Sequence, residues 1–138
     1  MTIPIIAAFA GALLVILQAI LMLPVAMHRI RNRIALGTGD DPVLERKVRR
    51  HGNLAENAAL FIVVLALAEM TVVPNDVVRN IAIIFLAGRI LHAIALSTVS
   101  GSHGADTGKI FQAFRAIGAF TTFGGFLVLG GYILAGLF

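Results

Sequence analysis

The chain has 138 residues, of which 59% are hydrophobic and 13% are charged, with no cysteine and a formal net charge of +4. A mean hydropathy of +0.95 is far too apolar for a soluble domain of this size. The composition therefore indicates an integral membrane protein. The absence of cysteine excludes disulfides, iron–sulfur clusters and a protein thiol nucleophile.

Apolar segments predict four membrane-spanning helices, at about residues 3–27, 43–73, 77–96 and 110–138. These segments leave no room for a separate soluble domain, so we expect a single all-α transmembrane domain over residues 1–138. The N-terminus lacks a basic n-region and a clear cleavage site, which favours a retained helix over a signal peptide.

The ends of these helices carry recognisable signals. Pro24 is expected to bend the end of the first helix. The segment 73–76, Val-Pro-Asn-Asp, predicts a tight turn with a capping residue at its end. Asp106 or Thr107 is expected to cap the fourth helix. The glycine-containing segment 37–41 matches no complete phosphate or calcium motif and predicts a plain turn.

Basic residues concentrate at one membrane flank and orient the bundle. The connection between the first two helices holds Arg29, Arg31, Arg33, Arg46, Lys47, Arg49 and Arg50. Lys109 and Arg115 add to the same side, whereas the opposite side offers Arg79. The positive-inside rule explains this pattern better than nucleic-acid binding does. It predicts cytoplasmic polar connections and periplasmic termini.

The second helix draws polar groups into the membrane. Arg49, Asn53 and Glu56 have the spacing of one helix face. Polar groups at this depth suggest a functional site. Arg89 and His92 share a face of the third helix, and Arg115 lies just inside the fourth.

These side chains are compatible with two interpretations. Three helices bring basic or amide groups to one end with a single acid, Glu56, which suits an anionic ligand that also carries an amine. Alternatively, Glu56 pairs with Arg89, while Asn53 and Asn57 form hydrogen bonds between helices.

Other chemistry has little support. The four histidines show no metal-ligand spacing, so no metal site is predicted. The serines near residue 100 lack a partner acid at defined spacing, so no hydrolase is predicted. Small residues recur at four-residue intervals and predict close helix packing, within or between subunits: Ala7 with Gly11, Ala8 with Ala12, Thr121 with Gly125, and Gly131 with Ala135.

The whole chain resembles the MAPEG family, the membrane-associated proteins in eicosanoid and glutathione metabolism, and is most similar to its bacterial members. The resemblance rests on Arg49, Asn53 and Glu56 in RRHGNLAEN, on GRILHAIAL at 88–96, and on Arg115 opening the last helix. A basic stretch followed by a Gly-x-Gly-Asp turn at 37–40 supports it.

The resemblance implies a homotrimer of four-helix subunits in the bacterial inner membrane, with glutathione bound between subunits at the cytoplasmic side. Arg49, Asn53 and Glu56 would hold the glutathione peptide, and His92 matches a ligand-contacting position in prostaglandin-E synthase. Arg89, beside His92, is a further candidate contact. Arg115 matches an arginine thought to stabilise the thiolate. Arg31, or else Arg29, matches a basic residue from the adjacent subunit.

The implied activity is a glutathione transferase or peroxidase acting on small lipophilic electrophiles from the bilayer. Asn57 and Leu96 stand where several members have tyrosines, and Ala116 stands where prostaglandin-E synthase has a serine, which disfavours prostaglandin synthesis. The alternative is a non-catalytic membrane scaffold that binds lipid or another anionic amphiphile.

Overall fold

The structure, a computed structural model, describes residues 3–97 and 108–138 of the chain. Its helices are α1 (Ile5–Asn32), α2 (Pro42–Met70), α3 (Asn75–Ala95) and α4 (Lys109–Leu137). All four are long and apolar enough to cross a membrane. No strand occurs within the described ranges, so the prediction of an all-α, four-helix membrane fold is confirmed.

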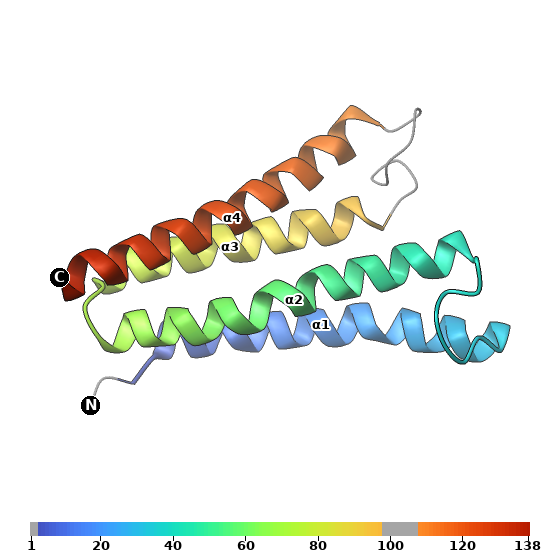
Figure 1. Ribbon diagram of the computed structural model, residues 1–138, viewed down its shortest axis with the longest axis horizontal. Coiled ribbons are helices and arrows are strands. Elements are labelled where there is room, and N and C mark those ends of the chain that lie inside the picture. The colour runs from blue at the N-terminus through green and yellow to red at the C-terminus, as the bar shows by residue number, and fades with distance from the viewer. Residues whose placement is uncertain (1–2, 98–107) are drawn as a thin grey trace.

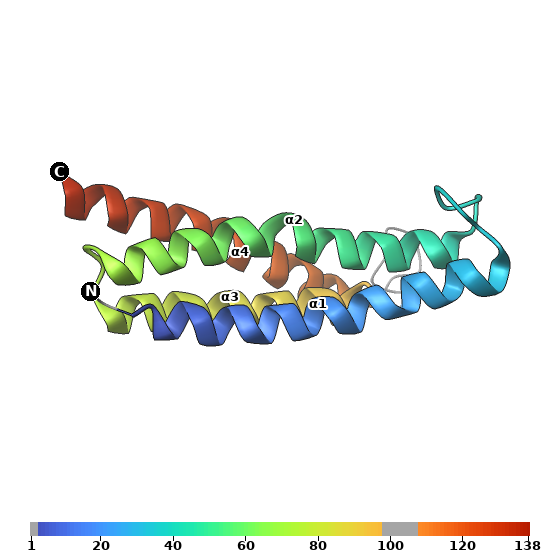
Figure 2. The ribbon, with the colours of Figure 1, turned by 90° about the horizontal axis from the view of Figure 1, so that it is seen from below.

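The helices lie alongside one another as two pairs (Figure 1). α1 packs mainly on α2, and α4 packs mainly on α3. Seen from below, α1 and α3 lie on one side of the bundle and α2 on the other, while α4 crosses from the side of α2 at its C-terminal end toward α3 at its start (Figure 2). Both termini lie at one end of the bundle, whereas the α1–α2 connection, the end of α3 and the start of α4 lie at the other. The basic helix ends are therefore gathered at one end.

α1 runs through Pro24 and extends beyond its predicted end at Met27. That predicted end is wrong because a proline removes one backbone donor but leaves the following residues free to continue the helix. The helix ends at Asn32, and its C-cap residue Arg33 has a left-handed φ of 55°. The N–H of Ile34 then donates to the carbonyl of Arg29 at 3.0 Å, closing the last turn.

The start of α1 is capped by a side chain from another helix. Pro4 at the N-cap makes no side-chain hydrogen bond. The carboxylate of Glu69, near the end of α2, accepts from the N–H of Ile6 at 2.9 Å and of Ala7 at 2.8 Å. Glu69 is buried, and an acid at a helix N-terminus satisfies free donors and complements the helix dipole. It therefore fastens α1 to α2 at the end of the bundle that carries the termini.

The predicted cap of α3 is wrong. Asn75 is already the first helical residue, and the N-cap position belongs to Pro74, which has no side-chain acceptor. The turn is closed instead by the N–H of Val73, which donates to the carbonyl of Ala68 at 3.3 Å. Gly108 is the N-cap of α4, and the residues predicted to cap that helix, 106 and 107, lie outside the described residues.

An aromatic cluster joins α2, α3 and α4. The rings of Phe61 and Phe85 stack with centroids 3.6 Å apart and an interplanar angle of 4°. Phe126 of α4 meets both rings edge-on, with centroids at 5.9 and 6.3 Å. Gly125 faces these rings, and a Cβ there would be in ordinary van der Waals contact with Phe61 at 3.5 Å. This part of the predicted small-residue pattern thus serves packing within one subunit.

α3 and α4 approach each other most closely at two glycines. A Cβ added at Gly118 would lie 2.6 Å from the Cβ of His92 and 2.7 Å from the carbonyl oxygen of Gly88. A Cβ at Gly88 would clash with Thr121. Both glycines are buried, so backbone contact between the two helices depends on their lack of a side chain.

Candidate functional site

A cavity of about 430 Å³ lies where the start of α2, the end of α3 and the start of α4 meet. Four of the predicted site residues line it: Arg49, Asn53, His92 and Arg115. Its other lining residues are Pro42, Glu45, Arg46 and Leu96. The α2 residues are Pro42, the adjacent pair Glu45 and Arg46, Arg49 and Asn53, and apart from that pair they are spaced by three or four, so the helix presents one face to the cavity.

The cavity is rich in positive charge. It is lined by the arginines Arg46, Arg49 and Arg115 and by one carboxylate, Glu45. The Nε of Arg49 lies 4.0 Å from the Glu45 carboxylate, and both side chains are more than half exposed. An exposed pair of this kind contributes little to stability and is easily exchanged for other partners. The arrangement suits a ligand with several carboxylates, which arginine can bind in bidentate geometry.

Two of the predicted site residues lie elsewhere on the bundle. Glu56 is exposed and does not line the cavity of its own subunit. Glu45, one turn further out than Arg49, lines it instead. Arg31 lies at a different cavity, between α1 and α2. The predicted ligand roles of Glu56 and Arg31 remain predictions.

Arg89 is buried next to this site and bonds to backbone carbonyls. Its Nη2 donates to the carbonyl of Gly118 at 2.7 Å, and its Nη1 donates to that of Asn53 at 3.4 Å. The guanidinium carbon lies 5.8 Å from the centroid of the Phe85 ring. Arg89 therefore ties α3 to both α2 and α4, and it does not line the cavity.

The alternative pairing of Glu56 with Arg89 is wrong. Arg89 is only 3% exposed and makes no ion pair with any residue in 3–97 or 108–138, whereas Glu56 is exposed on α2. The amide groups also bond within α2: Asn57 Nδ2 donates to the carbonyl of Asn53 at 2.8 Å, and Asn53 Nδ2 donates to that of Arg49 at 3.0 Å. The interhelical hydrogen bonds predicted for these two asparagines are therefore replaced by bonds along one helix.

A side-chain hydrogen bond also connects α2 with the end of α3 beside the cavity. Arg50 Nη1 donates to Ser97 Oγ at 2.6 Å, and that hydroxyl donates to the carbonyl of Ala93 at 2.7 Å. Ser97 directly follows Leu96, which lines the cavity. The hydrogen bond between Arg50 and Ser97 fixes the edge of the cavity. The sequence pattern does not predict this bond.

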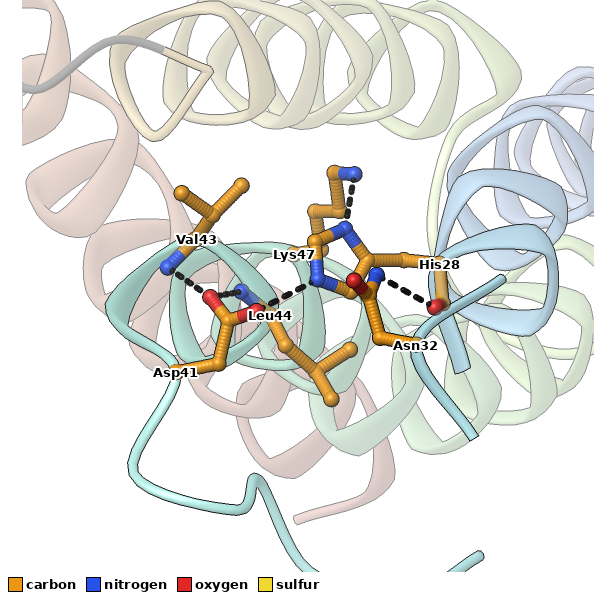
Figure 3. A network of polar contacts seen from close by, with 6 residues as sticks. All are labelled: His28, Asn32, Asp41, Val43, Leu44 and Lys47. Carbon is orange, nitrogen blue, oxygen red and sulfur yellow. Dashed lines mark hydrogen bonds and ion pairs between the residues drawn. The ribbon is translucent and has the colours of Figure 1, made fainter. Parts of the chain in front are cut away.

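A second polar cluster connects α1 with the start of α2 (Figure 3). His28 Nε2 and Asp41 Oδ2 are 2.7 Å apart, and Lys47 Nζ lies 2.9 Å from His28 Nδ1. Asp41 Oδ1 accepts from the backbone N–H groups of Val43 at 2.7 Å and Leu44 at 3.0 Å, which caps α2. The hydrogen bond from His28, together with the backbone bond from Leu44, lowers the pKa of Asp41 to about 2.

The sequence pattern does not predict this cluster. His28 and Asp41 are separated by the end of α1 and by the following turn, so no helical spacing relates them. A signal for one member was present, because Asp41 directly precedes Pro42, which is a common pairing at the N-terminus of a helix.

Comparison with known proteins decides the family. The profile of the MAPEG family matches residues 7–135, which is nearly the whole chain. The chain belongs to the MAPEG family. The chain is also 33% identical over 86 residues to inner membrane protein YecN of Escherichia coli strain K12, and equally so to YecN of E. coli O6:H1 strain CFT073. The match spans 59% of this chain and 66% of each relative, a little under two thirds of their length.

Membership confirms the resemblance seen in the sequence. This MAPEG protein is a membrane protein of a family associated with glutathione and eicosanoid metabolism, and its relative YecN is a bacterial inner membrane protein. The name of that relative specifies no activity.

Proposed function

We propose that this protein is a glutathione transferase or peroxidase of the bacterial inner membrane that acts on small lipophilic electrophiles. The observation that carries the proposal is the convergence of Arg49, Asn53, His92 and Arg115 on one cavity from three helices. Family membership and the inner-membrane relative support the same function and location. The basic helix ends support a cavity that opens toward the cytoplasm.

The residues of the cavity fit glutathione, which carries two carboxylates and one ammonium group. Arg46, Arg49 and Arg115 place guanidinium groups on the cavity wall that match the carboxylates, and Glu45 places a carboxylate there that matches the ammonium. Glu56 is a second candidate for the ammonium if a neighbouring subunit completes the site. The volume of about 430 Å³ lies within the range of about 300 to 1,000 Å³ that is usual for small-molecule sites.

Glutathione supplies a thiol whose ionised form is the nucleophile for electrophilic substrates. Arg115 opens α4 at the cavity wall, and a guanidinium near the sulfur favours the anionic form over the neutral thiol. Arg49 and Asn53 hold the peptide, and His92 orients it from α3. Arg89 fixes the relative positions of the three helices through its two carbonyl partners.

The proposed site is shared between subunits of a homotrimer. Apolar side chains remain exposed on the helices, among them Phe9 and Val15 on α1 and Phe120 and Phe123 on α4. Lipid or neighbouring subunits cover such surfaces in a membrane. Arg31 is proposed to reach the cavity of an adjacent subunit. A detergent-corrected particle mass equal to one subunit would contradict the trimer.

A non-catalytic scaffold that binds lipid or another anionic amphiphile is the second candidate. It is favoured by Leu96, which lines the cavity where several family members have a tyrosine, and by Asn57, whose amide bonds to its own helix. Both positions thus lack the phenol that contacts glutathione in those members.

Thermal unfolding with and without glutathione separates the two candidates. At a hundred times its dissociation constant, a ligand that binds only the folded state stabilises it by about 2.7 kcal/mol. We expect glutathione to raise the melting temperature of the detergent-solubilised protein. Unchanged melting at saturating glutathione would favour the scaffold.

Two matched variants identify the acid that meets the ammonium group. If Glu45 is the partner, Glu45→Gln should weaken stabilisation by glutathione and Glu56→Gln should not. The reverse result would return that role to Glu56. Asp76→Asn, at the opposite end of the bundle, removes an exposed carboxylate and is the control for a change of charge alone.

A further inference from the structure

A second cavity, of about 320 Å³, lies between α1 and α2. It shares no lining residue with the first cavity. Its walls change character along α1, from apolar side chains to basic ones, in the direction of the α1–α2 connection. The lining residues are Ile20, Leu23, Pro24, Met27, His28, Arg31 and Lys47.

The basic end of this cavity is held in place by hydrogen bonds. The Lys47 ammonium has only donors, so it donates to His28 Nδ1 across 2.9 Å. Nδ1 is then the acceptor, and the proton of the neutral ring lies on Nε2, which donates to Asp41 at 2.7 Å. Figure 3 shows the imidazole between the lysine and the aspartate.

Among the described residues, no carboxylate pairs directly with the lysine or the arginine at this end. Asp41 bonds to His28 and to the two backbone N–H groups at the start of α2. Neither Lys47 nor Arg31 makes an ion pair with any residue of the described ranges. Two cationic side chains therefore border a cavity whose remaining walls are apolar.

The position of the cavity matches the structure of a lipid leaflet. α1 has 28 residues and is about 42 Å long, so it exceeds a hydrocarbon core of about 30 Å. The basic end of α1 therefore reaches the headgroup region when the helix spans the bilayer. Ile20 and Leu23 are 60% and 59% exposed, so the apolar wall opens toward the lipid chains.

We propose that this cavity binds an anionic phospholipid of the leaflet on the side of the α1–α2 connection. Lys47 and Arg31 bind the phosphate, and an acyl chain lies along Ile20, Leu23 and Met27. Basic pockets between membrane helices recognise anionic headgroups in this way. Lys47 and the apolar walls belong to this cavity alone. Arg31 is also proposed above to reach the cavity of an adjacent subunit, so it serves one of the two ligands at a time.

Native mass spectrometry of the delipidated protein tests the proposal. The probes are dioleoylphosphatidylglycerol and the zwitterionic dioleoylphosphatidylcholine, added at equal concentrations. We expect the wild type to retain the anionic lipid in preference. Lys47→Gln should weaken that binding about fivefold, which corresponds to one basic residue near a membrane surface. Glutamine keeps a donor for His28, so the network survives the loss of charge.

Two further variants separate this site from general electrostatics. Arg33→Gln removes an exposed charge just beyond α1 that does not line the cavity, and it should leave the lipid preference unchanged. Met27→Trp fills the apolar part and should reduce lipid binding while all charges remain. An equal loss in Arg33→Gln and Lys47→Gln would overturn the proposal, as would undiminished binding in Met27→Trp.

The acyl chain is tested by competition. Glycerol phosphate carries a phosphate but no chain, so it should not displace the anionic phospholipid at equal concentration. Full displacement would show a site for a soluble anion and overturn the lipid as occupant. Equal retention of the anionic and zwitterionic lipids would overturn the proposal as well.

Discussion

Arg89 and Arg115 differ in what surrounds the guanidinium group. Arg89 is 3% exposed and donates to two backbone carbonyls, so replacing it removes the hydrogen bonds that join α3 to α2 and to α4. Arg115 is half-buried and lines the cavity. Arg89 is therefore suited to positioning the helices, and Arg115 is suited to contacting a ligand.

Arg115→Leu should abolish thiolate formation by bound glutathione at neutral pH. A free thiol has a pKa of about 8.5. Lowering that pKa by two units requires about 2.7 kcal/mol, which one well-placed guanidinium in a partly dry cavity can supply. The ultraviolet thiolate band measures the effect, and glutathione affinity should persist through Arg49 and Asn53. Arg79→Leu is the control, and an Arg115→Leu protein that keeps both the band and turnover would contradict the assignment.

Helical spacing predicted which basic and amide side chains line the cavity, but it did not predict which acidic side chain lines it. Arg49 and Asn53 share a face at any rotation of α2, so their position together follows from the sequence. Glu45 and Glu56 both fit that face by spacing, and the packing of α2 against α3 and α4 decides which one meets the cavity. His28, Asp41 and Lys47 could not be predicted as a cluster, because they meet through the path of a turn.

At the scale of the helices, length and hydropathy determined what could be predicted. Four apolar segments long enough to span a membrane were visible in the sequence, and the structure has four helices at those places. Helix ends depend on particular contacts, and these were less predictable. The carboxylate of Glu69 caps a helix more than 60 residues away in the sequence, and no local pattern shows that contact.

Gly118→Ala should destabilise the contact between α3 and α4. The added Cβ would meet His92 and the backbone carbonyl of Gly88, and backbone cannot move aside cheaply. Overpacking of this kind typically costs about 1–3 kcal/mol. Thermal unfolding followed by circular dichroism should show a lower melting temperature.

Gly130→Ala is the matched control on the same helix. A Cβ there meets nothing within 4 Å in the described subunit, and alanine favours a helix over glycine by up to about 1 kcal/mol. This variant should melt at or above the temperature of the wild type. A Gly118→Ala protein as stable as Gly130→Ala would show that the helices can separate without cost.

At the scale of the whole molecule, both cavities lie toward one end of the bundle and both termini lie at the other end. The first cavity uses the start of α2 and α4 and the end of α3, and the second uses the end of α1 with the start of α2. Both termini lie at the far end (Figure 1). The orientation of the bundle in the membrane therefore determines which compartment supplies the ligands of both cavities.

Reporter fusions test that orientation. Seven of the 11 basic residues lie between positions 29 and 50, at the end of the bundle that carries the cavities, so the positive-inside rule predicts that this end is cytoplasmic. Alkaline phosphatase fused after Phe138 should be active, because it folds in the periplasm, and a fluorescent protein inserted near Gly39 should fluoresce. Gly39 lies in the exposed α1–α2 connection, where an insertion disturbs no helix. The opposite pair of results would show that the arginine-lined cavity faces the periplasm. That orientation would contradict a cytoplasmic glutathione site and would leave the four-helix fold unaffected.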